Sequence, residues 1–136
     1  MSNNRLTSFP IIDQMQLLSL NLSGNNLTDM DSLPKKEWLQ VLDLSNNRLT
    51  SMTLSLSDMT SLKSLRLGGN AFAVLPSLPE AKEMQVLDIS FNNLSALPEG
   101  VERLIGLVKI NITGNPIARS EREKLKELFP NAEIVY

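Results

Sequence analysis

The amino-acid sequence predicts an α/β solenoid, a right-handed superhelix in which short parallel strands form one curved sheet and short return segments form the opposite side. Three observations support this fold class. Five segments of the 136-residue chain share one pattern of leucines, each segment carries an asparagine at the same place, and the asparagines recur at a nearly constant spacing. Self-similarity at a fixed period of about 20–50 residues indicates repeating units that stack on one another.

The shared pattern is L-x-x-L-x-L-x-x-N-x-L, with methionine, isoleucine or phenylalanine at some leucine places. It occurs at residues 17–27, 39–49, 62–72, 84–94 and 107–117. The pattern resembles that of leucine-rich repeat proteins, and five tandem matches make the resemblance specific. It implies a short free-standing array with its curved parallel sheet on the concave face and short helical, 3-10 or extended segments on the convex face.

Each repeat contains a short strand with one buried face. The x-L-x-L-x stretch alternates with a period of two, which places both of its leucines on the same side of a strand. The residues predicted to point inward are Leu20 and Leu22, Leu42 and Leu44, Leu65 and Leu67, Leu87 and Ile89, and Ile110 and Ile112. Because every crossover between repeats is alike, the strands are expected to be parallel and to stack roughly 4.8 Å apart.

One asparagine in each repeat stands where the chain must turn. Asn25, Asn47, Asn70, Asn92 and Asn115 lie 22, 23, 22 and 23 residues apart, and Asn4 fits the same place one repeat earlier. An asparagine amide both donates and accepts hydrogen bonds, so stacked repeats should form a ladder that satisfies buried backbone groups.

We expect one domain over residues 1–136. Its predicted parts are a half repeat at 1–16, repeats at 17–38, 39–61, 62–83, 84–106 and 107–118, and a C-terminal cap at 119–136. In the cap, Ser120 and Glu123 match a capping box, which predicts a helix from Glu121 that Pro130 ends. A last strand should follow over 132–136, with Ile134 and Tyr136 pointing inward.

The N-terminal half repeat lacks the strand that should precede it. Three explanations stay open: the chain is a piece of a longer array, the half repeat is a minimal cap, or the open edge pairs with another chain in self-association.

The composition argues against several classes of function. The chain has no histidine and no cysteine, which removes the usual triads, cysteine nucleophiles and zinc ligand sets. Its net charge of −2 disfavours a nucleic-acid partner, and no apolar stretch is long enough for membrane insertion. We therefore expect no enzymatic activity, no cofactor and no metal site. The lack of cysteine and of an N-terminal signal segment predicts an intracellular, cytoplasmic location.

The resemblance implies that a protein partner binds the concave sheet. The positions that match this face are a middle row of Asn21, Asp43, Arg66, Asp88 and Asn111, with Val41, Val86 and Lys109 beside it and Phe91 at its rim. Arg66 should lie between Asp43 and Asp88, close enough for cross-strand ion pairs. These charges are either a self-satisfied surface triad or a polar hot spot for the partner.

Two aromatic residues have two interpretations each. Phe91 either packs along its turn or is an exposed anchor for a partner. Trp38 either packs under the convex side, which we favour, or takes part in binding. The predicted function is non-catalytic protein–protein recognition through the concave sheet. Two alternatives remain: a structural or scaffold subunit that docks by its open N-terminal edge, and the targeting fragment of a larger signalling or effector protein.

Overall fold

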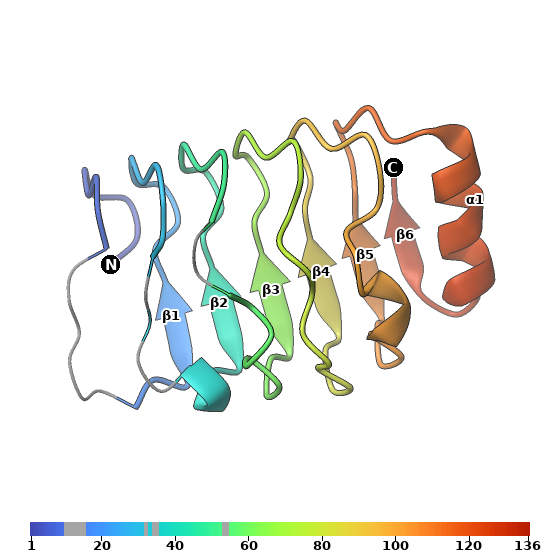
Figure 1. Cartoon of the computed structure of the whole chain (residues 1–136), viewed down its shortest axis with the longest axis horizontal. Coiled ribbons are helices and arrows are strands. Elements are labelled where there is room, and N and C mark those ends of the chain that lie inside the picture. Colours follow the sequence, from blue (N-terminus) through green and yellow to red (C-terminus); the bar gives the residue numbers. More distant parts are fainter. Residues whose placement is uncertain (10–15, 32, 34–35, 53–54) are drawn as a thin grey trace.

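The computed structural model describes residues 1–9, 16–31, 33, 36–52 and 55–136. Within these residues, six strands form a single parallel sheet in the order β1-β2-β3-β4-β5-β6 (Figure 1). The strands are β1 (Ser19–Asn21), β2 (Val41–Asp43), β3 (Ser64–Arg66), β4 (Val86–Asp88), β5 (Lys109–Asn111) and β6 (Glu133–Val135). The helical elements are the 3-10 turns η1 (Lys36–Trp38) and η2 (Val101–Arg103) and the α-helix α1 (Arg119–Leu128). The predicted solenoid is confirmed.

The strands are in register from one repeat to the next. The central residues of the strands are paired in the order Leu20, Leu42, Leu65, Leu87, Ile110 and Ile134. Because the register is constant, residues at the same place in each repeat form straight rows across the sheet. The predicted middle row therefore exists as a row of neighbouring residues.

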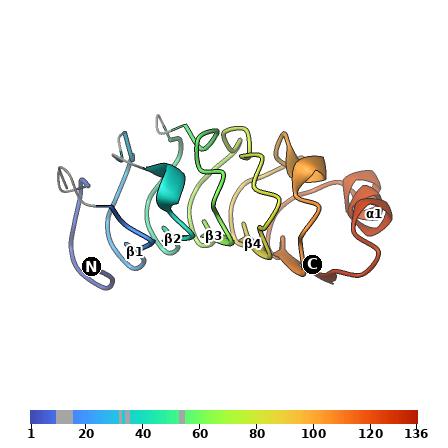
Figure 2. The same cartoon turned by 90° about the horizontal axis from the view of Figure 1, so that it is seen from below.

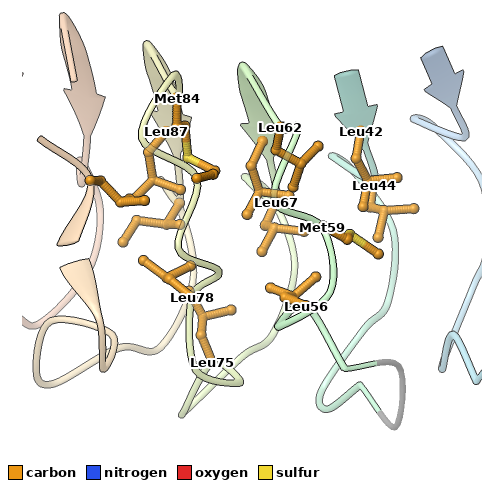
Figure 3. Packing of buried hydrophobic residues seen from close by; sticks show 14 of the residues in the cluster. Leu42, Leu44, Leu56, Met59, Leu62, Leu67, Leu75, Leu78, Met84 and Leu87 are labelled. Carbon is orange, nitrogen blue, oxygen red and sulfur yellow. The ribbon is translucent and has the colours of Figure 1, made fainter. Parts of the chain in front are cut away.

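The hydrophobic core is a single layer between the sheet and the return segments. The ten residues of the five repeats that were predicted to point inward are all buried. Figure 3 shows that side chains of the strand segments, such as Leu44 and Leu67, and of the return segments, such as Leu56 and Leu75, fill the space between them. Each repeat thus buries its leucines between its strand and its return segment and against the neighbouring repeats, as stacked repeats do.

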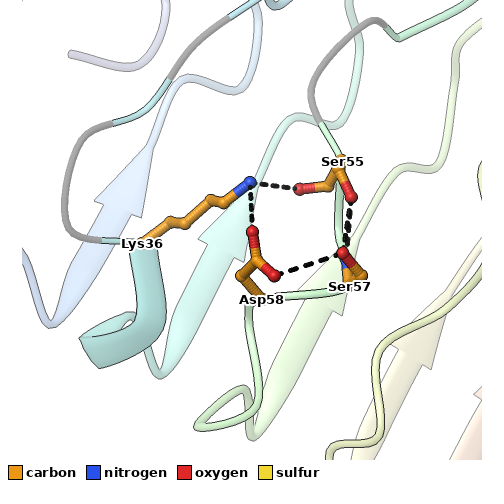
Figure 4. A network of polar contacts seen from close by, with 4 residues as sticks. All are labelled: Lys36, Ser55, Ser57 and Asp58. Carbon is orange, nitrogen blue, oxygen red and sulfur yellow. Dashed lines mark hydrogen bonds and ion pairs between the residues drawn. The ribbon is translucent and has the colours of Figure 1, made fainter.

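The return segments are short and irregular on the side opposite the sheet, as Figure 2 shows. Apart from α1 between β5 and β6, the helical turns there within the described residues are η1 and η2, which agrees with the predicted mixture of extended and 3-10 segments. The Lys36 side chain joins two of these segments (Figure 4). Its Nζ donates to the Ser55 carbonyl oxygen at 3.0 Å and lies 3.1 Å from Asp58 Oδ2. Residues 34–35 and 53–54 of these segments lie outside the described part of the chain.

The predicted asparagine ladder is present. In a typical rung, Asn92 Nδ2 donates to the carbonyl oxygens of Ile89 at 3.1 Å, Ser90 at 3.0 Å and, one repeat earlier, Leu67 at 3.1 Å. Asn92 Oδ1 accepts from the Phe72 N–H, also one repeat earlier, at 3.1 Å. A single side chain thus satisfies backbone groups in two adjacent repeats, which links the repeats directly.

The ladder begins within the N-terminal half repeat. Asn4 Nδ2 donates to the carbonyl oxygens of Met1 and Ser2, each at 3.1 Å, as its equivalents do within their own repeats. Asn25 then bridges back, donating to the Met1 carbonyl and accepting from the Leu6 N–H. The half repeat is therefore joined to the first full repeat by the same device, although residues 10–15 lie outside the described part.

The C-terminal helix begins earlier than predicted. Helix α1 begins at Arg119, and Ala118 is the N-cap residue without a side-chain cap hydrogen bond, so the predicted capping box at Ser120 is wrong. Glu123 pairs instead with Arg119, at 2.8 Å between Oε1 and Nε. The burial of Ile117 fixes the chain just before the helix, and this packing sets the start of α1 in place of the cap. The helix ends at Leu128, just before Pro130, as expected.

The last strand is also only partly as predicted. Ile134 is half-buried and packs against the core, but Tyr136 is 40% exposed rather than inward. Its ring lies under two cations of α1, with Arg122 Cζ at 6.0 Å and Lys126 Nζ at 5.4 Å from the ring centroid. Cation–π contacts with the helix therefore take the place of core burial at this residue.

Removing one rung of the ladder should destabilise the whole array. We expect Asn92→Ala to lower the free energy of unfolding by about 2–4 kcal/mol, because four buried backbone and side-chain hydrogen bonds lose a partner. Chemical denaturation measures the loss. Asn93→Ala is the matched control: its side chain is exposed, and we expect a change within about 0.5 kcal/mol. Equal effects of the two changes would contradict the role of the ladder.

One hydroxyl on the sheet has no partner. Ser64 Oγ is the sole buried side-chain oxygen or nitrogen of the described residues without a hydrogen bond, and Ser64 pairs in register with Val41 and Val86. We expect Ser64→Ala to stabilise the fold by roughly 0.5–1 kcal/mol, since it removes an unsatisfied buried group.

Thermal unfolding checks the Ser64 prediction. The control is Ser19→Ala, at the same place on β1, where the side chain is exposed and no more than about 0.5 kcal/mol of change is expected. Destabilisation by Ser64→Ala would show that the hydroxyl has a partner in solution.

Candidate functional site

The middle row of the concave sheet is built from a repeated turn. In four repeats an Asp or Asn at the end of the strand accepts hydrogen bonds from the N–H and the hydroxyl of a Ser or Thr two residues later. The pairs are Asn21 with Ser23, Asp43 with Ser45, Asp88 with Ser90, and Asn111 with Thr113, with hydroxyl contacts of 2.5–2.7 Å. Oδ1 of each of these side chains is therefore held in a fixed orientation by the chain itself.

The third repeat departs from this turn. It carries Arg66 in place of the acceptor and Gly68 in place of the hydroxyl residue. A Cβ added at Gly68 would lie 2.8 Å from Ser90 Oγ and 3.0 Å from Asp88 Oδ1. The missing side chain therefore leaves room for the Asp88–Ser90 pair of the next repeat and opens the sheet face at this point.

A hollow of about 390 Å³ lies on the sheet at Arg66 and Gly68 of the third repeat. It brings together seven of the nine residues predicted for the partner-binding face: Asp43, Arg66, Val86, Asp88, Phe91, Lys109 and Asn111. Asn21 and Val41 do not line it. Ser45, Gly68 and Ser90, which the sequence also places on this face of the sheet, line the hollow too. Sequence reasoning missed Asn46 and Gly69. The sequence feature that could have located the hollow is Gly68, which stands where the other repeats carry a serine or a threonine.

The predicted cross-strand ion pairs are absent. Arg66 is the register partner of both Asp43 and Asp88, yet among the described residues no carboxylate lies within 4.0 Å of its guanidinium. Asp43 and Asp88 turn instead toward Ser45 and Ser90, and Asp43 is only 8% exposed. The interpretation as a self-satisfied triad is therefore wrong, and the Arg66 donors stay open to solvent.

The remaining cation of the hollow is already paired. Lys109 Nζ lies 2.9 Å from Glu133 Oε1 on the neighbouring strand β6. The hollow therefore holds two carboxylates, Asp43 and Asp88, against the single unpaired cation Arg66.

Phe91 has an unusual backbone conformation. The residue just before each ladder asparagine has a positive φ, and elsewhere this residue is glycine or asparagine: Asn3, Gly24, Asn46, Gly69 and Gly114. Phe91 adopts φ of 49° at this place. A bulky residue in the left-handed region costs roughly 1–2 kcal/mol, and such strain is typical of functional positions.

The Phe91 ring both packs along its turn and stays exposed, so each of the two interpretations drawn from the sequence is correct in part. It lies along the turn against Gly114, where an added Cβ would approach ring atom Cδ1 to 2.5 Å. It nevertheless remains 62% exposed. The ring therefore has a fixed position and an open face at the rim of the hollow.

Trp38 does not pack under the convex side as favoured from the sequence. It ends η1, is 52% exposed and lies outside the hollow. At the same place in later repeats Glu83 is exposed and Ser61 is half-buried, so this place in the repeat lies at the surface.

Family models and solved structures are similar to this chain. Models for leucine-rich repeats match residues 15–29, 37–77 and 83–104. No protein with a curated description matches the chain. Among the described residues, no helix has both the length and the apolar character needed to cross a membrane.

Three solved structures illustrate the similarity. A leucine-rich repeat protein of Leptospira interrogans is 28% identical with a TM-score of 0.67, over 98% of this chain and 41% of that one. The effector YopM of Yersinia pestis is 32% identical with a TM-score of 0.72, over 83% and 30%. A Shigella effector leucine-rich repeat domain shares the fold at 22% identity and a TM-score of 0.64, over 96% and 77%.

The chain thus spans less than half the length of the first two of these proteins. Together with the repeats, the ladder and the parallel sheet, the matches identify the family: the chain is a leucine-rich repeat protein.

Proposed function

We propose that this chain recognises a protein partner through the hollow on its concave sheet, without a catalytic step. Leucine-rich repeat domains generally mediate protein–protein interaction and are generally not enzymes. The observation that carries the proposal is that one hollow holds both an unpaired arginine and an exposed aromatic ring whose residue has a strained backbone. Arginine and aromatic residues are enriched among the residues that dominate binding energy at interfaces.

The similarity to longer proteins fits a recognition role within a larger chain. YopM is named as an effector protein, and this chain is similar to 30% of its length. We therefore propose that any further activity of a protein containing this chain lies in other segments, and that this array supplies the contact with the partner.

A second candidate function rests on the N-terminal end of the sheet. Strand β1 has a pairing partner on one side only among the described residues, and Leu18 beside it is 57% exposed. An open strand edge with an exposed apolar residue is able to pair with another chain. Docking by this edge is the alternative to recognition through the hollow.

The two functions are separated by a matched pair of variants. We expect Arg66→Ala/Phe91→Ala to weaken binding of the partner at least about tenfold, since it removes both exposed anchors of the hollow. Both side chains are exposed, so the fold should be kept. The partner is first captured from source-cell lysate, and its affinity for each purified variant is then measured by calorimetry.

The control is Trp38→Ala/Arg103→Ala, which removes an exposed aromatic and an exposed arginine outside the hollow. We expect it to bind as the unchanged chain does. If the control loses the partner while the hollow variant keeps it, recognition through the hollow is wrong. If both keep the partner but Leu18→Asp loses it, the β1 edge is the docking site.

A further inference from the structure

We propose that the occupant of the hollow is an arginine side chain of the partner, stacked on the Phe91 ring with its guanidinium at the Asp88 carboxylate. This inference rests on the proposed function and names the chemistry that the hollow selects. Three arguments support it: the exposed Phe91 ring at the rim, the charges within the hollow, and the residues on either side of Asp88.

The aromatic rim is the first argument. The Phe91 ring is held against Gly114 and exposes most of its surface. The equivalent places are filled by glycine and asparagine, which adopt the same backbone without strain. A fixed, exposed aromatic face attracts cations, and a planar guanidinium stacks on it better than an ammonium does.

The charges of the hollow are the second argument. Asp43 and Asp88 outnumber Arg66, and Lys109 is paired with Glu133 at 2.9 Å. Ser90 holds Asp88 Oδ1 through its N–H at 3.0 Å and its hydroxyl at 2.6 Å. The second carboxylate oxygen has no partner among the described residues and remains available to a cation.

The position of Asp88 between its neighbours is the third argument. Arg66 lies on one side of Asp88, on β3, and the uncharged Asn111 lies on the other side, on β5. The Phe91 ring also lies toward this side, against Gly114, which follows β5. An incoming guanidinium therefore reaches the ring and the carboxylate together from the side away from Arg66, where no unpaired cation repels it.

The test uses small probes and the whole chain. Backbone amide shifts of the ¹⁵N-labelled protein are followed during titration with N-acetyl-arginine-methylamide. Two comparison probes are N-acetyl-citrulline-methylamide, which has the shape of the arginine probe but no charge, and N-acetyl-glutamate-methylamide. We expect saturable shifts at Asp88, Phe91 and Gly114, with affinity on the order of millimolar for a single side-chain contact and at least about fivefold tighter for arginine than for citrulline.

Two variants identify the groups responsible. Asp88→Asn keeps the acceptor for Ser90 but removes the charge, and we expect it to abolish the preference for arginine over citrulline. Phe91→Asn should weaken arginine binding at least about fivefold while leaving the melting temperature equal or higher, since Asn3 and Asn46 occupy the same place. Trp38→Ser is the matched control and should bind all probes unchanged.

Several results would overturn the inference. These are equal binding of arginine and citrulline, tighter binding of glutamate, shifts centred on Trp38, or no shifts at all. A fall in melting temperature of more than about 5 °C in Phe91→Asn would also overturn it, since it would show that the Phe91 ring stabilises the fold rather than serving a ligand. If the arginine probe fails while Arg66→Ala/Phe91→Ala still loses the partner, the proposed function stands and only the arginine chemistry falls.

Discussion

One asparagine side chain at each repeat boundary bonds to both neighbouring repeats, and the regular stacking of the structure depends on this link together with the backbone hydrogen bonds beside it. The strands are three residues long, and backbone hydrogen bonds between repeats continue beyond them, as from the Asn46 N–H to the Gly68 carbonyl at 2.8 Å and from the Ala71 N–H to the Leu49 carbonyl at 2.8 Å. The ladder asparagines bind carbonyl and N–H groups on both sides of each repeat boundary. They therefore set the register, and a constant register places the leucines in one core and the polar residues in straight rows on the sheet.

The same regularity makes the single irregular repeat conspicuous. Four repeats use the side chain at the end of the strand to fix their own turn. The third repeat has Arg66 and Gly68 in place of the acceptor and the hydroxyl donor, so it lacks this hydrogen bond, and the hollow lies at these two residues. Next to it the chain accepts backbone strain at Phe91. The chain thus lacks a local bond and carries backbone strain beside the hollow proposed for the partner, and such features are typical of recognition sites.

Most of the fold could be predicted from the sequence because one short pattern is repeated five times. The inward leucines, the ladder and the parallel order all follow from period and spacing. Features that depend on three-dimensional packing could not be predicted. The start of α1 is decided by the burial of Ile117 rather than by the Ser120 motif, and Trp38 follows the outward place in its repeat rather than its own hydrophobicity.

The positions of the candidate site on the sheet could be predicted from the sequence, but the orientations and contacts of its side chains could not. The rows of the sheet place Asp43, Arg66 and Asp88 side by side. Whether their charges meet depends on side-chain torsions, and the serine hydroxyls take the carboxylates away from Arg66. The exposure of the Phe91 ring depends on the size of Gly114 in the next repeat, a relation that no single repeat contains.

That relation recurs along the array. The side chain before a ladder asparagine lies against a glycine of the following repeat in three successive pairs: Asn3 with Gly24, Asn46 with Gly69, and Phe91 with Gly114. Side chain and glycine therefore alternate, and two consecutive repeats form one steric unit. Excision of the single repeat 62–83 would bring Asn46 against Phe91 with no glycine between them. Removal or insertion of two consecutive repeats would keep the alternation of side chain and glycine, whereas a change of one repeat would break it.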